Sequence, residues 1–449
     1  MPSSSETTCC VVGGGPAGVM LGYLLARKGV PVTVLEKHAD FFRDFRGDTV
    51  HPSTLQLMYE LGILEDFLRV PHQEIRTVSG VYGDFAFQAA DFRFLPTHCK
   101  FVALMPQWDF LDFLSGKAKQ YPSFDLRMEH EAVDLLHDSG SIAGVKVKTA
   151  EQELEIRADL VIGCDGRHSI MRQAGGLQVQ EFGVPIDVLW FRIRRHADDP
   201  DQLLGNINFG KALILINRGD YFQAGLIVRK GSFDELKTRG LESFRDSLRQ
   251  IAPYLGDRPN EITDWEQVKL LTVQLNRLRQ WHRPGLLCIG DAAHAMSPAG
   301  GVGINLAIQD AVATANLLAD PLRQKRVTNA SLAAVQGRRE LPTILTQEMQ
   351  ANAHKLFAKI FENPGPAHAP WQLKVVTEIP GVQRVMGRVI GLGVRPEHIA
   401  EAEPQPRPTS GRTRMIKIAA GIGLAAAVVA LSVAALRQCS RRKVAWSWR

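Results

Sequence analysis

A glycine-rich turn near the N-terminus is the feature that most constrains the fold of this chain. The residues GGGPAG at positions 13–18 follow a short apolar run, Thr8–Val12, and open a stretch with helical apolar spacing, Pro16–Lys28. An alternating, β-branched run follows at Val30–Glu36. A strand, a turn, a helix and a second strand in this order predict a βαβ-sized unit with parallel strands.

The spacing of the glycines in this turn predicts a dinucleotide site. Gly13 permits the tight turn, Gly15 lets the backbone approach a pyrophosphate, and Gly18 lets helix and strand pack closely. Ala17 lies at the start of the helix, where unpaired N–H groups attract phosphate. Glu36 closes the second strand, where a carboxylate can accept hydrogen bonds from a ribose hydroxyl. On this motif alone, NAD and FAD are both possible ligands.

Two later segments carry acidic turns that follow buried strands. The segment Asp159–Arg172 contains an Asp-Gly turn at Asp165, and the segment from 290 to 305 opens with Gly-Asp at Asp291. A carboxylate such as Asp291 can bind sugar or ribityl hydroxyls. The N–H groups of Gly303–Asn305, at a glycine-rich helix entrance, can stabilise negative charge on a reduced flavin ring. Taken singly, each segment could also be a structural turn or a helix cap.

In this order, the three motifs resemble the signatures of the FAD-dependent aromatic hydroxylases typified by p-hydroxybenzoate hydroxylase and the ubiquinone-biosynthesis hydroxylases. The resemblance spans Thr8 to Asp320. It implies that FAD is the cofactor and assigns a contact to each of several residues. These are Glu36 at the adenosine ribose, Arg46 and Gln107 at the dinucleotide, Asp165 and Arg172 at flavin and nicotinamide nucleotides, Asp291 at the polyol, Pro298 above the reacting flavin edge, and Gly303, Ile304 and Asn305 at the isoalloxazine ring.

The resemblance also implies a reaction. NAD(P)H would reduce FAD, O2 would add to the reduced ring, and the flavin hydroperoxide would hydroxylate an aromatic or quinone-like lipophilic substrate. No side chain is assigned as a catalytic residue, and no metal site is expected. His294 is interpreted as a packing residue of the Gly-Asp turn, and His51 and His98 are left unassigned.

The predicted fold is α/β: a Rossmann-type FAD-binding domain with an inserted antiparallel β-sheet substrate domain, C-terminal helices and a transmembrane helix. The predicted units are an FAD-binding domain in three parts (1–75, 101–180 and 281–320), a substrate-domain segment (76–100), a substrate-binding β-sheet domain (181–280), a C-terminal helical region (321–400), a linker (401–414), a transmembrane helix (415–437) and a basic tail (438–449).

Helices are expected at Ser53–Phe67 and Phe233–Leu255, among others. The stretch Val184–Val228 reads as antiparallel strands, which would form the substrate sheet. Five side chains there are candidates to line a pocket, although strand alternation predicts that about half of them fill the core. They are Trp190, Phe209, Tyr221, Phe222 and Gln223.

The formal net charge of +6 belongs to the C-terminal end of the chain. From Arg412 onwards there are eight basic residues and no acidic ones, which leaves 45 basic against 47 acidic residues elsewhere. Nucleic-acid binding, which would need a basic face on the folded body, is therefore not expected. Ile418–Leu436 is a run of 19 residues without a charge. At ~1.5 Å per residue it is just long enough to span a bilayer core, although an Ala-rich helix packed on protein is an alternative.

The cysteines and the N-terminus favour a reducing, cytosol-facing compartment. None of the six cysteines forms a CxxC pair, and Cys9, Cys164 and Cys288 lie in apolar runs where buried thiols are expected. Met1–Thr8 is polar and does not resemble a signal peptide.

Three other functions use the same kind of framework. Flavin-dependent halogenases carry W-x-W-x-I-P within the body, whereas here Trp-x-Trp occurs only at Trp446–Trp448 and without Ile-Pro. A prenyl-lipid reductase would carry an aromatic-Pro signature that this chain lacks. The third alternative is a membrane-tethered flavin-binding protein without turnover.

Overall fold

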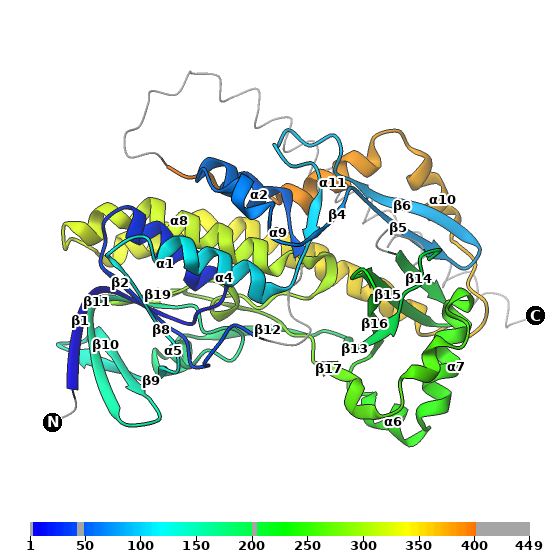
Figure 1. Cartoon of the computed structure of the whole chain (residues 1–449), viewed down its shortest axis with the longest axis horizontal. Coiled ribbons are helices and arrows are strands. Elements are labelled where there is room, and N and C mark those ends of the chain that lie inside the picture. The colour runs from blue at the N-terminus through cyan, green and yellow to red at the C-terminus, as the bar shows by residue number, and fades with distance from the viewer. Residues whose placement is uncertain (1–2, 43–48, 200–203, 401–449) are drawn as a thin grey trace, which may run out of the picture.

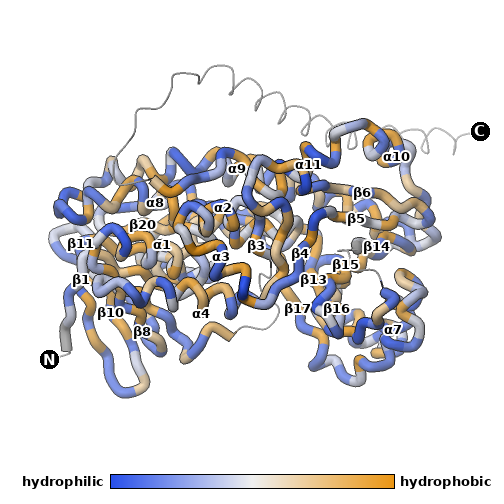
Figure 2. The backbone as a smooth tube through the Cα atoms, turned by 45° about the horizontal axis from the view of Figure 1, so that its top comes forward, coloured by the Kyte–Doolittle hydropathy of each residue, from blue (hydrophilic) through white to orange (hydrophobic). Residues whose placement is uncertain are grey.

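Two large β-sheets organise the chain and lie side by side along its long axis (Figure 1). The computed structural model describes residues 3–42, 49–199 and 204–400. Hydrophobic segments run along the central strands and helices, whereas the peripheral helix α7 (Leu241–Ile251) is largely hydrophilic (Figure 2).

The first sheet has the order β19-β20-β11-β1-β2-β8, with a β9–β10 hairpin attached to β11. Its strands are β1 (Ser3–Val12), β2 (Val32–Leu35), β8 (Phe124–Arg127), β9 (Glu131–Asp138), β10 (Ser141–Lys148), β11 (Glu153–Gly163), β19 (His282–Arg283) and β20 (Leu286–Cys288). The strands from β20 to β8 run parallel to their neighbours. The carboxyl ends of β1, β2, β11 and β20 therefore meet at one edge, where ligands bind in open α/β sheets.

Helices cover both faces of this parallel sheet, which explains its apolar strands. All four residues of β2 are buried, as expected for a parallel strand covered on both sides. The helices α1 (Pro16–Arg27), α4 (Gln107–Ala118) and α8 (Gly303–Arg323) lie on one face, and α5 (Ile170–Ala174) lies with the β9–β10 hairpin on the other (Figure 1).

The second sheet has the order β17-β13-β16-β15-β14-β5-β6. Its strands are β5 (Thr77–Tyr82), β6 (Phe85–Asp91), β13 (Ile186–Arg194), β14 (Leu204–Asn208), β15 (Lys211–Asn217), β16 (Tyr221–Arg229) and β17 (Lys269–Leu271). The strands predicted in Val184–Val228 pair antiparallel with one another, but the sheet as a whole is mixed, because β14 pairs with β5 in parallel. The β5–β6 hairpin comes from a distant part of the chain, so no tight turn imposes an antiparallel direction on this pairing.

Two small sheets connect the large ones. The sheet β3-β7-β4 comprises Thr49–Val50, Val102–Leu104 and Gln73–Ile75. The chain leaves the first body through β12 (Val179–Phe182) and returns through β18 (Leu275–Leu278), and these two strands pair antiparallel.

Two predicted helices are each broken by a glycine with positive φ. The predicted helix Ser53–Phe67 is two helices, α2 (Pro52–Glu60) and α3 (Leu64–Phe67), with Gly62 at φ +72° between them. The predicted helix Phe233–Leu255 is likewise split, with Gly240 at φ +89° between α6 (Phe233–Thr238) and α7. Left-handed backbone cannot continue a right-handed helix.

The C-terminal helices are α9 (Asn329–Ile360), α10 (Trp371–Glu378) and α11 (Val382–Leu392). The predicted linker, transmembrane helix and basic tail lie outside the described residues, as does Cys439. Among residues 3–42, 49–199 and 204–400, only the segment Ala299–Arg323 is long and apolar enough to cross a membrane, and 78% of its apolar window is buried within the fold. It is thus a core helix of the first body.

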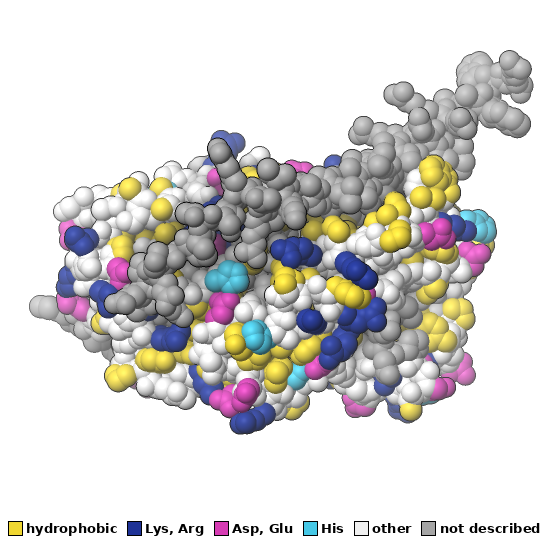
Figure 3. Space-filling view, turned by 90° about the horizontal axis from the view of Figure 1, so that it is seen from above, with side chains coloured by type: hydrophobic (Ala, Val, Ile, Leu, Met, Phe, Trp, Pro, Cys, Tyr) yellow, Lys and Arg dark blue, Asp and Glu magenta, His cyan; other side chains and the backbone are white. Residues whose placement is uncertain are grey.

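On the face shown in Figure 3, several lysine and arginine side chains lie close together near the centre, beside apolar side chains.

The described cysteines agree with the thiol argument. Cys9, Cys164 and Cys288 are buried free thiols, as predicted. Burial raises the pKa of each of these thiols well above its ordinary value.

Candidate active site

The glycine turn closes tightly between the end of β1 and the start of α1. Gly13 has φ +108°, and a Cβ there would lie 2.5 Å from the carbonyl oxygen of Cys164. A Cβ on Gly18 would lie 1.9 Å from the carbonyl oxygen of Gly13. The first and third glycines are therefore required by packing alone.

Gly15 differs from its neighbours because it faces open space. It is the N-cap residue of α1, and a Cβ built on it would meet no atom of the described residues within 4 Å. Within residues 3–42, 49–199 and 204–400 no side chain caps this helix end, so its first N–H groups are left for a ligand. A helix N-terminus of this kind attracts phosphate through its N–H groups and its dipole.

Glu36 lies beside this turn, one residue beyond β2. Its Oε2 accepts a hydrogen bond of 3.1 Å from the Gly14 N–H, and its Oε1 accepts one of 3.0 Å from the His38 N–H. The carboxylate is therefore fixed in orientation at the carboxyl edge of the sheet. Gln107 is the half-buried first residue of α4, which packs beside α1. Arg46 lies outside the described residues.

The Asp-Gly turn follows β11, next to the glycine turn. Oδ2 of Asp165 accepts a hydrogen bond of 3.1 Å from the Met171 N–H, and the Ser169 hydroxyl accepts one of 3.0 Å from the Arg172 N–H. These contacts cap α5. Arg172 is buried and donates to the carbonyl of Arg167 at 2.5 Å. Most of the hydrogen bonds of Asp165 and Arg172 are thus made within the turn and the helix that follows it.

One oxygen of Asp165 remains available. Its Oδ1 is buried and has no hydrogen-bond partner among the described residues. Burial raises the pKa of this carboxyl. A buried acceptor without a partner is costly, and a ligand donor beside the turn would relieve that cost.

The Gly-Asp turn brings the three motifs together. A Cβ on Gly290 would lie 3.4 Å from that of Ala17 in α1 and 3.1 Å from that of Ala307 in α8. The next residue, Asp291, is half-buried, and the Arg167 guanidinium donates to its Oδ2 at 3.4 Å. Asp291 and Arg167 thus join the Gly-Asp turn to the Asp-Gly turn, a contact that sequence reasoning missed.

The start of α8 is locked by the side chain of Asn305. Its Oδ1 accepts hydrogen bonds from the His51 N–H at 2.9 Å and the Thr54 hydroxyl at 2.7 Å. Its Nδ2 donates to the carbonyls of Thr49 and Gly301. The Asn305 side chain is thus occupied by protein, which leaves only the backbone of this residue for a ligand. Pro298 precedes the entrance as the N-cap of a short 3-10 turn.

Sequence reasoning also missed a buried polar group behind the Gly-Asp turn. Asp310 on α8 is fully buried, and its Oδ2 accepts hydrogen bonds from His294 Nε2 at 2.6 Å and the Gly290 N–H at 3.1 Å. His294 is therefore a packing residue held by an acid, in agreement with its predicted structural role. The sequence did contain a signal for this group, because Asp310 is a charged residue at a core position of an otherwise apolar helix.

The candidate substrate side chains divide between two faces of the second sheet. Trp190 lies opposite Gly225 in the strand register, and Gln223 and Tyr221 share that face. Phe222 points the other way, into a core cluster with α7. Phe209 lies in the β14–β15 turn with φ +48°.

The Trp190 face is turned toward the α8 entrance through the sheet β3-β7-β4. Trp190 packs in a cluster with Leu104 of β7, and Leu104 is the register partner of Thr49 in β3. The Thr49 hydroxyl in turn donates to the Gly301 carbonyl at 2.9 Å. The Trp190 face is thus linked to the α8 entrance by packing and one hydrogen bond.

Comparison with known proteins places this geometry in a family. The model of the family described as "FAD binding domain" matches residues 6–348. The 6-methylpretetramide 4-monooxygenase of Streptomyces rimosus is 29% identical over 416 residues, which cover 89% of this chain and 97% of the relative. The 3-demethoxyubiquinol 3-hydroxylase of Escherichia coli is 24% identical over 326 residues, covering 70% and 80%.

Solved structures show the same fold. The OxyS anhydrotetracycline hydroxylase from Streptomyces rimosus superposes with a TM-score of 0.69 at 21% identity and covers 90% of this chain and 78% of its own. The chain belongs to the FAD-binding domain family and, within it, to the FAD-dependent monooxygenases.

Proposed function

We propose that this chain binds FAD across the three motifs and uses NAD(P)H and O2 to hydroxylate an aromatic or quinone-like lipophilic substrate. The observation that carries the proposal is the convergence of Ala17, Gly290 and Ala307, which brings the glycine turn, the Gly-Asp turn and the α8 entrance to one place. Family membership supports the cofactor, and the relatives' names support the reaction class.

The residues present fit FAD. The open space at Gly15 would receive the pyrophosphate, and Glu36 would bind the adenosine ribose. Asp291 would bind the polyol, and the backbone at Gly303, Ile304 and Asn305 would contact the flavin ring. The remaining proposed contacts are those of Gly13, Ala17, Gly18, Arg46, Gln107, Asp165, Arg172 and Pro298.

Bound FAD, once reduced, would supply the oxygen-activating chemistry. The protein's own contribution is to bind, orient and exclude water. The side chain of Asn305 fixes the α8 entrance against β3 and α2, so that its backbone N–H groups are held toward the ring site without reorganisation.

The substrate class is proposed from two features. The relatives are named for 6-methylpretetramide and 3-demethoxyubiquinol. The uncharged segment Ile418–Leu436, flanked by basic residues, supports a membrane anchor and hence access to lipophilic molecules.

Trp190 is the side chain of the substrate sheet that is best placed to orient a substrate. Its Nε1–H is buried without a hydrogen-bond partner among the described residues, and its ring lies against Gly225, where a Cβ would approach it to 2.9 Å. We expect Trp190→Phe to raise KM several-fold at only a modest cost in stability, because the substitution removes the unpartnered N–H together with part of the ring volume. Phe222→Ala should instead cost about 3–5 kcal/mol of stability, because Phe222 fills the opposite core. Steady-state kinetics measures the effect of Trp190→Phe on KM, and urea unfolding measures the effect of both substitutions on stability. An unchanged KM in Trp190→Phe contradicts the proposal that Trp190 orients the substrate.

The proposed reaction is tested with a panel of phenols and quinols. FAD-loaded protein should oxidise NADH or NADPH faster when the correct substrate is present, and isotopically labelled O2 should leave one labelled oxygen atom in the product. A peroxide assay measures uncoupled oxidation. A saturated product without label would identify a prenyl-lipid reductase. Failure of both nicotinamides to reduce the bound flavin under every condition would favour a protein without turnover.

A further inference from the structure

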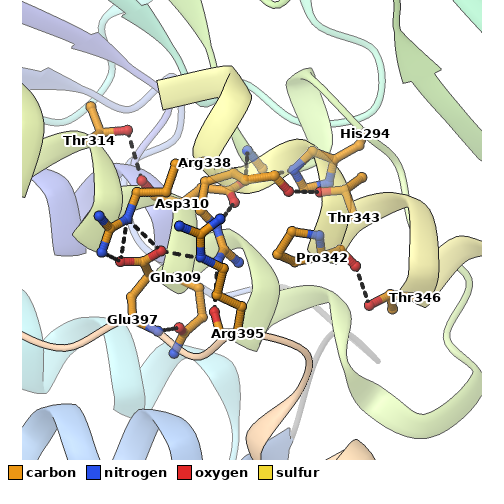
Figure 4. Close-up of polar contacts among 12 residues, drawn as sticks. His294, Gln309, Asp310, Thr314, Arg338, Pro342, Thr343, Thr346, Arg395 and Glu397 are labelled. Atoms are coloured by element: carbon orange, nitrogen blue, oxygen red, sulfur yellow. Dashed lines mark hydrogen bonds and ion pairs between the residues drawn. The ribbon is translucent and has the colours of Figure 1, made fainter. Parts of the chain in front are cut away.

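Asp310 is the centre of a charged network that lies directly behind the Gly-Asp turn (Figure 4). Besides Gly290 and His294 on its Oδ2, it accepts a hydrogen bond of 2.9 Å from Arg339 Nε on its Oδ1. Burial alone would raise the pKa of Asp310, but His294 and Arg339 hold it below its ordinary value. The network therefore presents a fixed negative charge to the N–H of Gly290.

The network continues to the last described part of the chain. We call residues 393–397, which follow α11, the strap. Arg339 Nη1 donates to the Arg395 carbonyl and to Oε1 of Glu397, both at 3.3 Å. Arg338 donates to both carboxylate oxygens of Glu397, with its shortest contact at 2.6 Å. The backbone N–H of Glu397 also donates to Gln309 Oε1.

The strap is thus connected to the turn by a continuous line of buried charges. Glu397 is 2% exposed and Arg339 is 1% exposed, so neither can exchange its partner for water. Removing one member of a buried pair leaves the other uncompensated. If the Glu397 carboxylate is lost, Asp310 is the remaining carboxylate partner of the Arg339 guanidinium. The strength of the ion pair between Arg339 and Asp310 then changes.

The orientation of the Gly-Asp turn depends on the carboxylate of Asp310. Gly290 has φ +59°, and its N–H points at Asp310 Oδ2. The next side chain, Asp291, is the proposed polyol ligand. A shift of Asp310 therefore moves the residue that would hold FAD.

We propose that Glu397 is a positioning residue that acts through Arg339 and Asp310. The contacts of the strap with Arg338 and Arg339 would thereby set the affinity of the Gly-Asp turn for FAD. This inference rests on the proposed role of Asp291.

The chain offers a matched control in Glu60. Its Oε1 contacts His398 Nδ1 at 2.6 Å and its Oε2 accepts a hydrogen bond of 2.9 Å from the Ile399 N–H. Glu60 therefore holds the residues just after the strap, but its hydrogen bonds go to Gln56, His398 and Ile399 and not to Arg339 or Asp310. Glu60→Gln is the same chemical change beside the same segment.

The test is FAD titration of full-length apoprotein, followed by quenching of flavin fluorescence, and potentiometry of the loaded protein. Remote positions typically change coupling by about 0.5–2 kcal/mol, so Glu397→Gln should weaken FAD binding roughly 2- to 30-fold and shift the flavin midpoint potential. Glu60→Gln should change neither. Arg338→Gln removes one of the two arginine partners of Glu397 and leaves Arg339 in place, so it should show a smaller effect in the same direction. This variant replaces Glu397→Gln in the test if Glu397→Gln does not fold.

A double-mutant cycle with Asp310→Asn identifies the route. The effect of Glu397→Gln on FAD affinity should largely disappear when Asp310 is already neutral. Equal FAD affinity in wild type and Glu397→Gln, or full additivity in the cycle, overturns the proposal. Wild-type apoprotein that binds no FAD overturns the proposed function instead. Thermal unfolding of each apoprotein separates a local effect on the turn from a general loss of stability.

Discussion

Gly15→Ala is expected to leave the apoprotein folded while removing most of its affinity for FAD. The added Cβ would meet no atom within 4 Å in the described part of the chain, and the backbone φ is −75°, so the fold accepts it. The same methyl group would stand between the α1 N-terminus and an incoming pyrophosphate. Losing one or two charge-assisted hydrogen bonds of about 1.5–3 kcal/mol each predicts at least a ~10-fold increase in Kd, and well over ~100-fold if both are lost.

The matched contrast is Gly18→Ala, in the same turn. Its Cβ would lie 1.9 Å from the carbonyl oxygen of Gly13, so the turn itself must distort and the apoprotein should lose stability. Urea unfolding of both apoproteins and FAD titration of Gly15→Ala check the pair. Wild-type FAD affinity in Gly15→Ala would show that the pyrophosphate does not approach this helix end.

The apoprotein should lose stability steeply between pH 6.5 and pH 4, because two buried histidines must take up protons on unfolding. Burial lowers the pKa of His51 to about 4, although its hydrogen bond to the Ile390 carbonyl opposes the shift. Burial also lowers the pKa of His354 to about 4. The unfolded chain therefore binds more protons throughout this window, so stability is fully present above pH 6.5 and falls as the pH is lowered. At ~1.4 kcal/mol per pKa unit, the loss is roughly 3 kcal/mol for each histidine.

Urea unfolding at a series of pH values measures this effect. His51→Asn, which keeps a donor for the Ile390 carbonyl, should flatten the dependence by about half, as should His354→Gln. His137 is exposed on β9, so His137→Gln is the control and should leave the slope unchanged. A slope that is the same in all four proteins would mean that other groups control the acid transition.

Local sequence was sufficient for the elements on which the cofactor site depends. The spacing of Gly13, Gly15 and Gly18 predicted a turn whose first and third glycines are indeed required sterically. Helix breaks were missed at Gly62 and Gly240, because a single glycine within an apolar periodic pattern does not reveal whether its φ is positive.

The substrate sheet shows where periodicity fails. One of its faces packs against α7 and the other against α9, α11 and the small sheet β3-β7-β4. Because both faces are covered, alternation could not distinguish Phe222, which fills the α7 core, from Trp190, which packs beside the small sheet β3-β7-β4. Only the strand register separated them.

The glycine turn, the two acidic turns and the resemblance to flavoprotein hydroxylases could all be identified from the sequence. Each of these is written in a short segment whose backbone needs particular residue types. The tertiary structure alone decided how those turns meet at Gly290, and how Asp310 connects that meeting point to Arg339 and Glu397. These partners are 29 and 58 residues apart, and a buried charge finds its partner through packing, which no local pattern encodes.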